Sequence, residues 1–319
     1  MAITTGGLTQ TMATYYSKVF LEKARLLIRH DAFAQKRGVP ANQGKVVNFT
    51  RHVAPAVATT GLTESVTPSA VNSTAATVAV TLVEYGAYSQ ISKFYEKTSI
   101  DVGLKEQVEA LGINMGESID TIIRNVLRDG AGLAIYASAS AGATSSGSVL
   151  VAHVLTAPDV RRSVRALKKT KAIPFQGTQG NPVFGGLICP ESAYDLLGDS
   201  TWQATQQYVN PDPMKRGILG TFFGVEFVET NNAYVSVPAT SGSVVYTTWV
   251  FGKEAYGVVS IDSEDVTSPG AASLIIKDSG PNDTGNPLSL WSTVGWYAPF
   301  NAAVLNSDWI VHIYAGATV

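Results

Sequence analysis

The clearest hydrophobic pattern in the chain is a helical stripe between Asp101 and Gly130. Apolar residues recur there at spacings of four, three, four, four, three and four, which is the period of an α-helix with one buried face. They are Leu104, Val108, Leu111, Met115, Ile119, Ile122 and Val126. Asp101 is the expected N-terminal cap, and the helix should be roughly 40 Å long. Gly112 and Gly116 weaken a helix, so we expect another backbone to approach closely there.

A second helix is expected nearer the start of the chain. Residues 9–37 contain neither proline nor glycine, and Gly38 and Pro40 follow as stop signals. The apolar positions form only a loose stripe: Tyr16, Val19, Phe20, Leu26, Leu27 and Phe33. The pattern predicts a helical arm, broken along its length, that packs against something outside itself.

Residues 45–53 and 77–92 alternate like strands and are rich in Val, Thr and Tyr. Between them, Leu62 is the single large apolar residue, and Glu64 is the single charge from His52 through Val83. This segment cannot build a core, and it is too long for an ordinary hairpin loop. Each limb of about 20 residues could extend roughly 65 Å. We expect a projecting hairpin that lies across a neighbouring molecule.

The remainder mixes helices and strands and predicts an α+β fold. Thr156 and Asp159 form a capping box at the start of a helix. Its residues Val160, Val164 and Leu167 should face a core, and Arg161, Arg165 and Lys168 the opposite side. A strand at 183–189 leads into a helix at Pro190, and strands dominate after Phe222. Residues 137–149 and 201–220 are expected to be loops.

Charge is scarce and unevenly placed. Only 15% of the 319 residues are charged, against about 25% in typical soluble domains. Residues 1–52 carry a net charge of +6, and the rest of the chain carries −8. A surface with so little charge favours contact with other copies. The basic segment suggests an acidic partner, which is nucleic acid or the acidic face of a neighbouring copy.

Motifs for chemistry are missing. The sequence has no phosphate-binding loop, dinucleotide fingerprint or esterase elbow. Its four histidines are scattered; we expect His312 to be structural and the single Cys189 to be a buried small hydrophobe. The acidic group Asp262, Glu264 and Asp265 is interpreted as a solvated turn, as are most such clusters. We therefore expect no catalytic residue, metal or cofactor. Neither a secretion signal nor a membrane span is expected.

The order of these parts resembles the major capsid fold of tailed phages, the Hong Kong 97 type. Several segments are more narrowly similar to the major capsid family named after phage N-four. The matching stretches are Leu62 to Pro68, Glu84 to Gly86, Gln90 to Ser92, Gly116 to Asp120, Pro190 to Asp195 with Trp202, Gly224 to Thr230, Ala255 to Gly257 and Thr293 to Trp296. The resemblance runs in order over nearly the whole chain.

The resemblance implies a division of the chain. Residues 1–43 would be an N-terminal arm and 44–92 an extended E-loop hairpin. Residues 93–155, with the long spine helix, would begin a P-domain, and 261–319 would be its returning sheet. Residues 156–260 would form an A-domain that meets its copies at capsomer centres. Some relatives join subunits by a Lys–Asn isopeptide bond; no such trio with a Glu is placed here, and non-covalent assembly is expected.

The function implied is self-assembly, in hexamers and pentamers, of an icosahedral shell around the double-stranded DNA of a tailed bacteriophage. The protein would be made in the bacterial host cytoplasm and end in the virion capsid. Its partners would be other copies of itself, portal, scaffold and decoration proteins, and packaged DNA by non-specific contact, with no membrane. Alternatives are an encapsulin-like nanocompartment and, more distantly, a secreted adhesin or a hydrolase.

Candidate site residues are therefore those of assembly interfaces. They are Lys18, Lys23, Arg25 and Arg29 in the arm, Leu62 and Glu64 in the hairpin, and Arg161, Arg165 and Lys168 in the capped helix. The arm's cations are interpreted as an inter-subunit element, with a DNA clamp as the alternative. The cations of the capped helix are interpreted as a solvated face or an inter-subunit salt-bridge surface.

Overall fold

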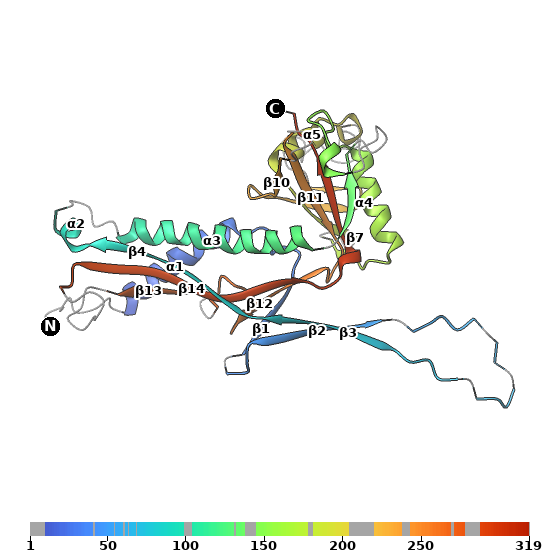
Figure 1. The fold of residues 1–319 in the computed structure, drawn as a ribbon, viewed down its shortest axis with the longest axis horizontal. Coiled ribbons are helices and arrows are strands. Elements are labelled where there is room, and N and C mark those ends of the chain that lie inside the picture. Colours follow the sequence, from blue (N-terminus) through green and yellow to red (C-terminus); the bar gives the residue numbers. More distant parts are fainter. Residues whose placement is uncertain are drawn as a thin grey trace.

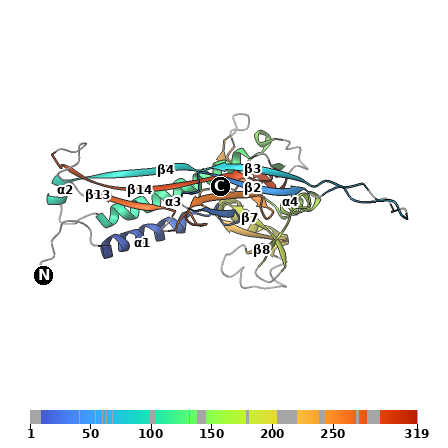
Figure 2. The same cartoon turned by 90° about the horizontal axis from the view of Figure 1, so that it is seen from below.

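The molecule is an elongated spine with a compact part at one end and a long hairpin projecting beyond it (Figures 1 and 2). The structure, a computed structural model, describes residues 10–40, 42–53, 55–59, 61–62, 64–67, 69–98, 104–130, 132–137, 145–177, 181–203, 220–237, 243–268, 271–277 and 288–318. Its described helices are α1 (Gln10–Leu27), α2 (Lys93–Thr98), α3 (Leu104–Asp129), α4 (Ala157–Lys169) and α5 (Pro190–Gly198).

The strands form a long sheet, a compact sheet and a hairpin. The long sheet contains β1 (Gln35–Val39), β4 (Val83–Ser92), β12 (Tyr256–Ile261), β13 (Ser273–Lys277) and β14 (Trp291–Val304). The compact sheet contains β5 (Leu133–Tyr136), β6 (Phe175–Gln176), β7 (Pro182–Ile188), β8 (Thr221–Phe222), β9 (Val225–Glu229), β10 (Val235–Ser236), β11 (Val245–Phe251) and β15 (Ile310–Ala315). The hairpin is β2 (Val46–Val53) with β3 (Thr74–Thr81).

The 14-residue strand β14 is the axis of the long sheet. β4 pairs antiparallel along it from Trp291 to Phe300, while β13 and β12 pair in succession along the other edge. β1 then adds to β12 in parallel. Because β14 pairs with three strands from separate parts of the chain, β4, β12 and β13, it holds the elongated shape together.

Helices α1 and α3 pack on this sheet and on each other (Figure 2). A Cβ at Gly112 would lie 2.7 Å from the Phe20 carbonyl oxygen, and one at Gly116 would lie 2.7 Å from that of Ala24. The close backbone approach expected at the two glycines is therefore confirmed. The approach buries Phe20, Ala24 and Met115 completely in the main hydrophobic core.

The compact sheet has the strand order β5-β15-β11-β7-β9-β8. Helices α4 and α5 pack with this sheet around the second hydrophobic core of the protein. The capping box at Thr156 and Asp159 forms as expected, with Asp159 Oδ2 accepting the Thr156 N–H at 3.2 Å. Val160 and Leu167 are buried in that core. Cys189 is 2% exposed and caps α5, so its expected burial is confirmed.

The expected helix over residues 9–37 is wrong beyond Leu27. The chain turns there, and Gln35–Val39 is a strand, β1, paired with Gly257–Ile261. The hydrogen bonds of that parallel ladder outweigh a local composition that suits a helix. The expected strand over residues 77–92 is likewise divided at Leu82, so β3 belongs to the hairpin and β4 to the long sheet.

Two details of the spine helix also differ from the expected pattern. The buried stripe continues through Ile123 and Leu127 in place of Ile122 and Val126, which are only half-buried. From Met115 to Leu127 the buried positions recur every four residues, which is slightly more than one helical turn, so the contact line winds slowly around the helix. Asp101, the expected cap, lies outside the described residues.

The sheets cross the expected domain ranges. β4 lies in the long sheet although residues 44–92 are expected to form the E-loop hairpin, and β12 lies there although 156–260 are expected to form the A-domain. Conversely, β5 and β15 lie in the compact sheet although their residues are expected in the P-domain. The reason is long-range strand pairing, which contiguous ranges cannot express.

We expect a methyl group at the helix crossing to destabilise the protein. Gly116→Ala should lower the free energy of unfolding by about 1–3 kcal/mol, because the Cβ has to displace the backbone of α1. The expected loss is opposite in sign to the gain of about 1 kcal/mol in helix stability that a Gly→Ala substitution brings at an exposed helix site. Urea denaturation followed by circular dichroism measures the difference. Ile113→Ala, at an exposed position of the same helix, is the control; a stabilised Gly116→Ala would show that the close contact is absent.

Candidate assembly surfaces

The hairpin exposes apolar side chains that this chain does not cover. The paired ladder ends at Val53 and Thr74. Beyond it, Val57 is 82% exposed and Leu62 is 78% exposed, and Glu64 is exposed beside them. The base of the hairpin is fixed on the long sheet by a small core that includes Phe49, Val80 and Leu82. The tip is therefore held out from the body by a rigid base, as Figure 1 shows.

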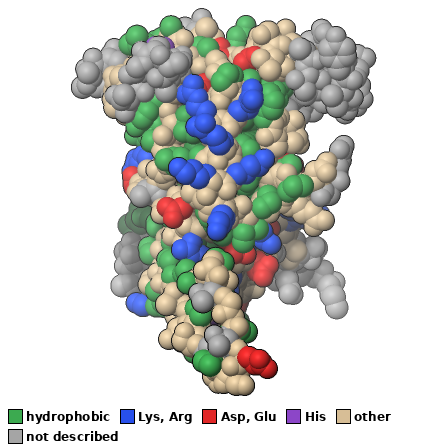
Figure 3. All heavy atoms as spheres, turned by 90° about the vertical axis from the view of Figure 1, so that its right-hand side faces the viewer, with side chains coloured by type: hydrophobic (Ala, Val, Ile, Leu, Met, Phe, Trp, Pro, Cys, Tyr) green, Lys and Arg blue, Asp and Glu red, His purple; other side chains and the backbone are tan. Residues whose placement is uncertain are grey.

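A basic face covers the outer side of α4. Arg161, Arg165 and Lys168 are exposed there, on the side opposite the buried Val160 and Leu167, as expected. Figure 3 shows Lys and Arg side chains gathered on the side of the molecule that also carries the hairpin. The Arg161 guanidinium lies 5.6 Å from the Phe223 ring centroid, a cation–π contact that places an arginine between the helix and the end of β8.

The cations expected in the arm divide between two faces of α1. Lys23 lies 3.5 Å from Glu109 of α3, so this pair joins the two helices. Lys18 and Arg25 on another face, and Arg29 just beyond the helix, line one groove together with Ser263, Asp265, Thr267 and Ser268. The structure therefore brings three of the four predicted residues together and separates Lys23 from them.

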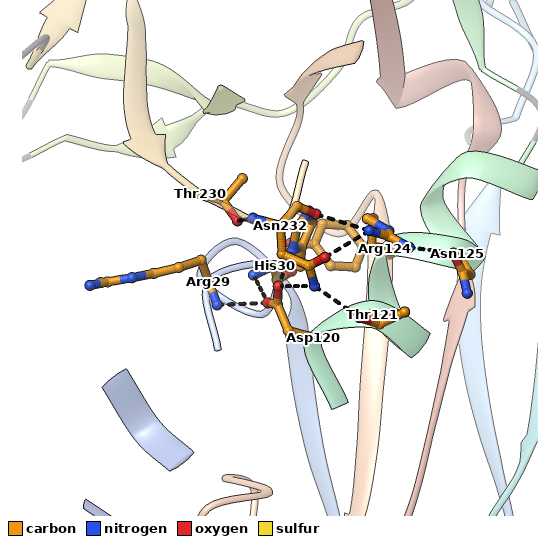
Figure 4. Close-up of polar contacts among 9 residues, drawn as sticks. Arg29, His30, Asp120, Thr121, Arg124, Asn125, Thr230 and Asn232 are labelled. Atoms are coloured by element: carbon orange, nitrogen blue, oxygen red, sulfur yellow. Dashed lines mark hydrogen bonds and ion pairs between the residues drawn. The ribbon is translucent and has the colours of Figure 1, made fainter. Parts of the chain in front are cut away.

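A buried polar cluster joins the arm, the spine helix and the compact part (Figure 4). Asp120 Oδ1 accepts the backbone N–H groups of Arg29 and His30, each at 2.8 Å. Asp120 Oδ2 accepts from His30 Nδ1 at 2.8 Å and from Asn232 Nδ2 at 2.9 Å. Arg124 Nη1 donates to Asn232 Oδ1 at 2.7 Å. One carboxylate thus takes four hydrogen bonds from two separate segments.

The electrostatics of this cluster favour an ionised Asp120. Burial by itself raises the pKa of a carboxyl group. The hydrogen bonds from His30 and Arg29 outweigh that effect and hold the pKa of Asp120 below its usual value. Tyr256 also takes part, because its buried hydroxyl donates to the His30 carbonyl oxygen at 2.6 Å. The cluster is structural, since both Asp120 and His30 are 0% exposed.

Sequence reasoning did not find this cluster. Asp120 follows Ile119 in the predicted stripe and lies one helical turn after Gly116, so the helical period places it on the buried face. A charged residue at a core-facing position is the one local signal in the sequence that indicates a buried polar cluster. Its partners His30 and Asn232 come from segments about 90 and 112 residues away, and nothing local points to them.

The remaining candidate groups are separated or structural. Burial lowers the pKa of His312 to about 4, consistent with the expected structural role in β15. Burial also raises the pKa of the Cys189 thiol. Asp265 accepts from Lys36 Nζ at 2.9 Å, so one member of the acidic turn has a cation partner. The described residues contain no group of three or more ligating side chains placed to hold a metal.

No helix in the described ranges combines the length and hydrophobicity needed to cross a bilayer.

The surface features described above are an exposed apolar hairpin and the basic faces of α1 and α4, all carried on a long spine. This combination of a spine helix on a long sheet, a compact α/β part and a projecting hairpin is the Hong Kong 97-type arrangement of phage shell proteins.

Comparison with known proteins gives the same class. A family model described as phage capsid protein matches residues 48–273. The chain therefore belongs to the phage capsid protein family, and it is a major capsid protein. No curated protein matches the sequence.

Solved structures show the same fold at low sequence identity. The capsid of Ralstonia phage GP4 matches with a TM-score of 0.69 and 15% identity, over 91% of this chain and 89% of that chain. The capsid of cyanophage Pam1 matches with a TM-score of 0.67 and 16% identity, over 92% of each chain. An encapsulin complex from Synechococcus elongatus shares the fold more distantly, with a TM-score of 0.52 and 11% identity over 98% of this chain and 91% of that chain.

Replacing Asp120 should weaken the attachment of two segments to α3, the turn at Arg29 and His30 and the loop at Asn232. Asp120→Asn should lower the free energy of unfolding at pH 7 by about 3 kcal/mol, since buried donors lose their ionic acceptor. The lowered pKa makes this contribution present above pH 3.8 and lost below it as the folded-state pKa is crossed. The variant should therefore lose less stability than wild type in acid. Urea denaturation at pH 7 and pH 3 measures both effects, with the exposed Asp129→Asn as control.

His312 should make stability fall in mild acid. Its pKa is about 4 in the folded chain against 6.5 when unperturbed, so between these values the unfolded chain binds a proton that the folded chain does not. Stability should fall by up to about 3 kcal/mol as the pH drops through this window. His312→Leu should remove that slope, and the exposed His52→Asn should keep it. An unchanged slope in His312→Leu, measured by urea denaturation from pH 7 to pH 4, would contradict the assignment.

Proposed function

We propose that this major capsid protein self-assembles into hexamers and pentamers of an icosahedral shell that encloses the double-stranded DNA of a tailed bacteriophage. The observation that carries the proposal is the projecting hairpin, whose apolar residues Val57 and Leu62 are largely exposed in the single chain. An exposed extended segment is an aggregation hazard unless a partner covers it. In a closed shell, every copy offers a neighbour on which the hairpin can lie.

The parts of the chain take separate roles in this proposal. Residues 1–43 are an arm that contacts adjacent subunits, and the hairpin between β2 and β3 is the E-loop. The long sheet with α3 is the P-domain, and it includes β12. The compact sheet with α4 and α5 is the A-domain, which meets its copies at capsomer centres, and it includes β5 and β15. This division follows the sheets and not contiguous ranges of residues.

Assembly is proposed to be non-covalent and to need no catalytic residue. Each contact contributes modest free energy, and the shell gains stability because every subunit makes many of them. The basic face around Arg161, Arg165 and Lys168 is exposed and serves as a salt-bridge surface towards another subunit. The near-neutral net charge of −2 suits DNA packaging, because a strongly basic lining would grip the genome.

Membership of the phage capsid protein family supports a proposal for the further partners. Portal, scaffold and decoration proteins join the shell, packaged DNA meets it by non-specific contact, and the protein is made in the cytoplasm of the bacterial host. Negative-stain electron microscopy combined with size-exclusion chromatography tests the core of the proposal. Closed shells, rings or tubes tens of nanometres across are the expected result, whereas a monomer at all concentrations, with scaffold supplied, would overturn it.

Shortening the hairpin should separate folding from assembly. Replacing residues 54–73 with Asn-Gly should close a two-residue turn between Val53 and Thr74, which already face each other in the ladder. We expect the free energy of unfolding of the variant to stay within about 1 kcal/mol of that of wild type, since none of the described residues in this segment belongs to a hydrophobic core. It should form no shells in electron micrographs. Normal shells from this variant would contradict the role given to the hairpin.

A further inference from the structure

A groove of about 1380 Å³ runs along α1, opposite the loop that follows β12. Lys18 and Arg25 are seven residues apart and lie on one face of α1, and Arg29, just after the helix, lines the groove with them. Leu21 and Leu26 supply apolar surface beside them, and Leu26 is 62% exposed. The volume exceeds that of most small-molecule sites, which suits a segment of polypeptide.

The groove carries unsatisfied positive charge. Among the described residues, Lys18, Arg25 and Arg29 form no ion pair with a carboxylate. Two carboxylates also line the groove, Glu22 and Asp265. Asp265 is already paired with Lys36 at 2.9 Å, so only Glu22 offsets the three cations. The excess positive charge and the apolar surface favour an occupant that combines an apolar side chain with an anionic group.

The hairpin tip has this chemistry. Leu62 is 78% exposed, and Glu64, two residues later, is the only charged residue from Val53 through Val83. The hairpin tip and α1, which lines the groove, lie towards opposite ends of the molecule, as both Figure 1 and Figure 2 show. A chain therefore cannot place its own tip in its own groove. The partner has to be a second copy.

We infer that the α1 groove receives the hairpin tip of another copy, with the Glu64 carboxylate facing Lys18 and Arg25 and the Leu62 side chain against Leu21 and Leu26. This inference rests on the proposed assembly and names the receiving surface. About ten residues lie between the ladder and the tip on each limb, a reach of about 33 Å at about 3.3 Å per residue. This reach exceeds the length of α1, about 27 Å for 18 residues, so a docked limb can run along the helix.

A charge exchange between the two surfaces tests the inference. Glu64→Lys alone, and Lys18→Glu with Arg25→Glu, should each reduce the yield of shells at least tenfold, because like charges would meet in the groove. Combining all three substitutions should restore most of the yield. The matched control reverses Arg161 and Arg165 in place of the arm cations, and Glu64→Lys should not rescue that variant. Shell yield is measured by sedimentation and electron microscopy.

A crosslink locates the contact independently of assembly yield. Glu64→Cys with Arg25→Cys should form disulfide-linked dimers and ladders on oxidation of assembled particles, whereas Glu64→Cys with Arg161→Cys should not. The native Cys189 is buried and leaves a low background. If neither rescue nor crosslinking is seen while the shortened hairpin still abolishes shells, the groove assignment is wrong and the assembly proposal stands. If the shortened hairpin assembles normally, both fail.

Discussion

The buried carboxylate of Asp120 is the interaction on which the rest of the arrangement depends. An ionised group with no exposure is tolerated only when its hydrogen bonds are complete. Its donors are Arg29 and His30 in the turn after α1, and Asn232 in the loop between β9 and β10. The arm and the compact part are therefore held at fixed positions on the spine helix. The same turn delivers the chain to β1, so the edge of the long sheet depends on this contact as well.

The elongated spine limits what one chain can bury by itself. Helices α1 and α3 pack on the long sheet and create its core, while alternate residues of β4, such as Tyr88 at 69% exposure, face away. Gly112 and Gly116 of α3 let the backbones of α1 and α3 approach closely, which increases the buried area at their crossing. They cannot cover the outer strand face or the hairpin. A protein of this shape reaches full burial only when other copies supply the missing surfaces.

Local signals predicted the elements whose causes are local. The capping box at Thr156 and the stripe of the spine helix as far as Ile119 depend on neighbouring residues, and the structure contains both. Gly112 and Gly116 indicated a close contact, but nothing local indicated that α1 supplies it. Residues 35–39 form a strand only because residues 257–261 lie beside them, and no local pattern encodes that pairing. The same holds for the sheet membership of β12 and β15, and for the donors gathered around Asp120. For the surfaces, sequence identified the basic residues, but only the structure separated Lys23 from the groove.

The scarcity of charge in the hairpin has a physical consequence for specificity. A neutral extended strand would pair with any free strand edge, and the sequence opposes this with Pro55 and Pro68, which lack an N–H donor, and with Glu64. A lone carboxylate costs little at an exposed tip, yet it is unfavourable against apolar or acidic surfaces. In the proposed docking, Glu64 would discriminate among sites chiefly by excluding the wrong ones. With so few other charges in the segment, this one residue would carry most of the electrostatic selectivity of the tip.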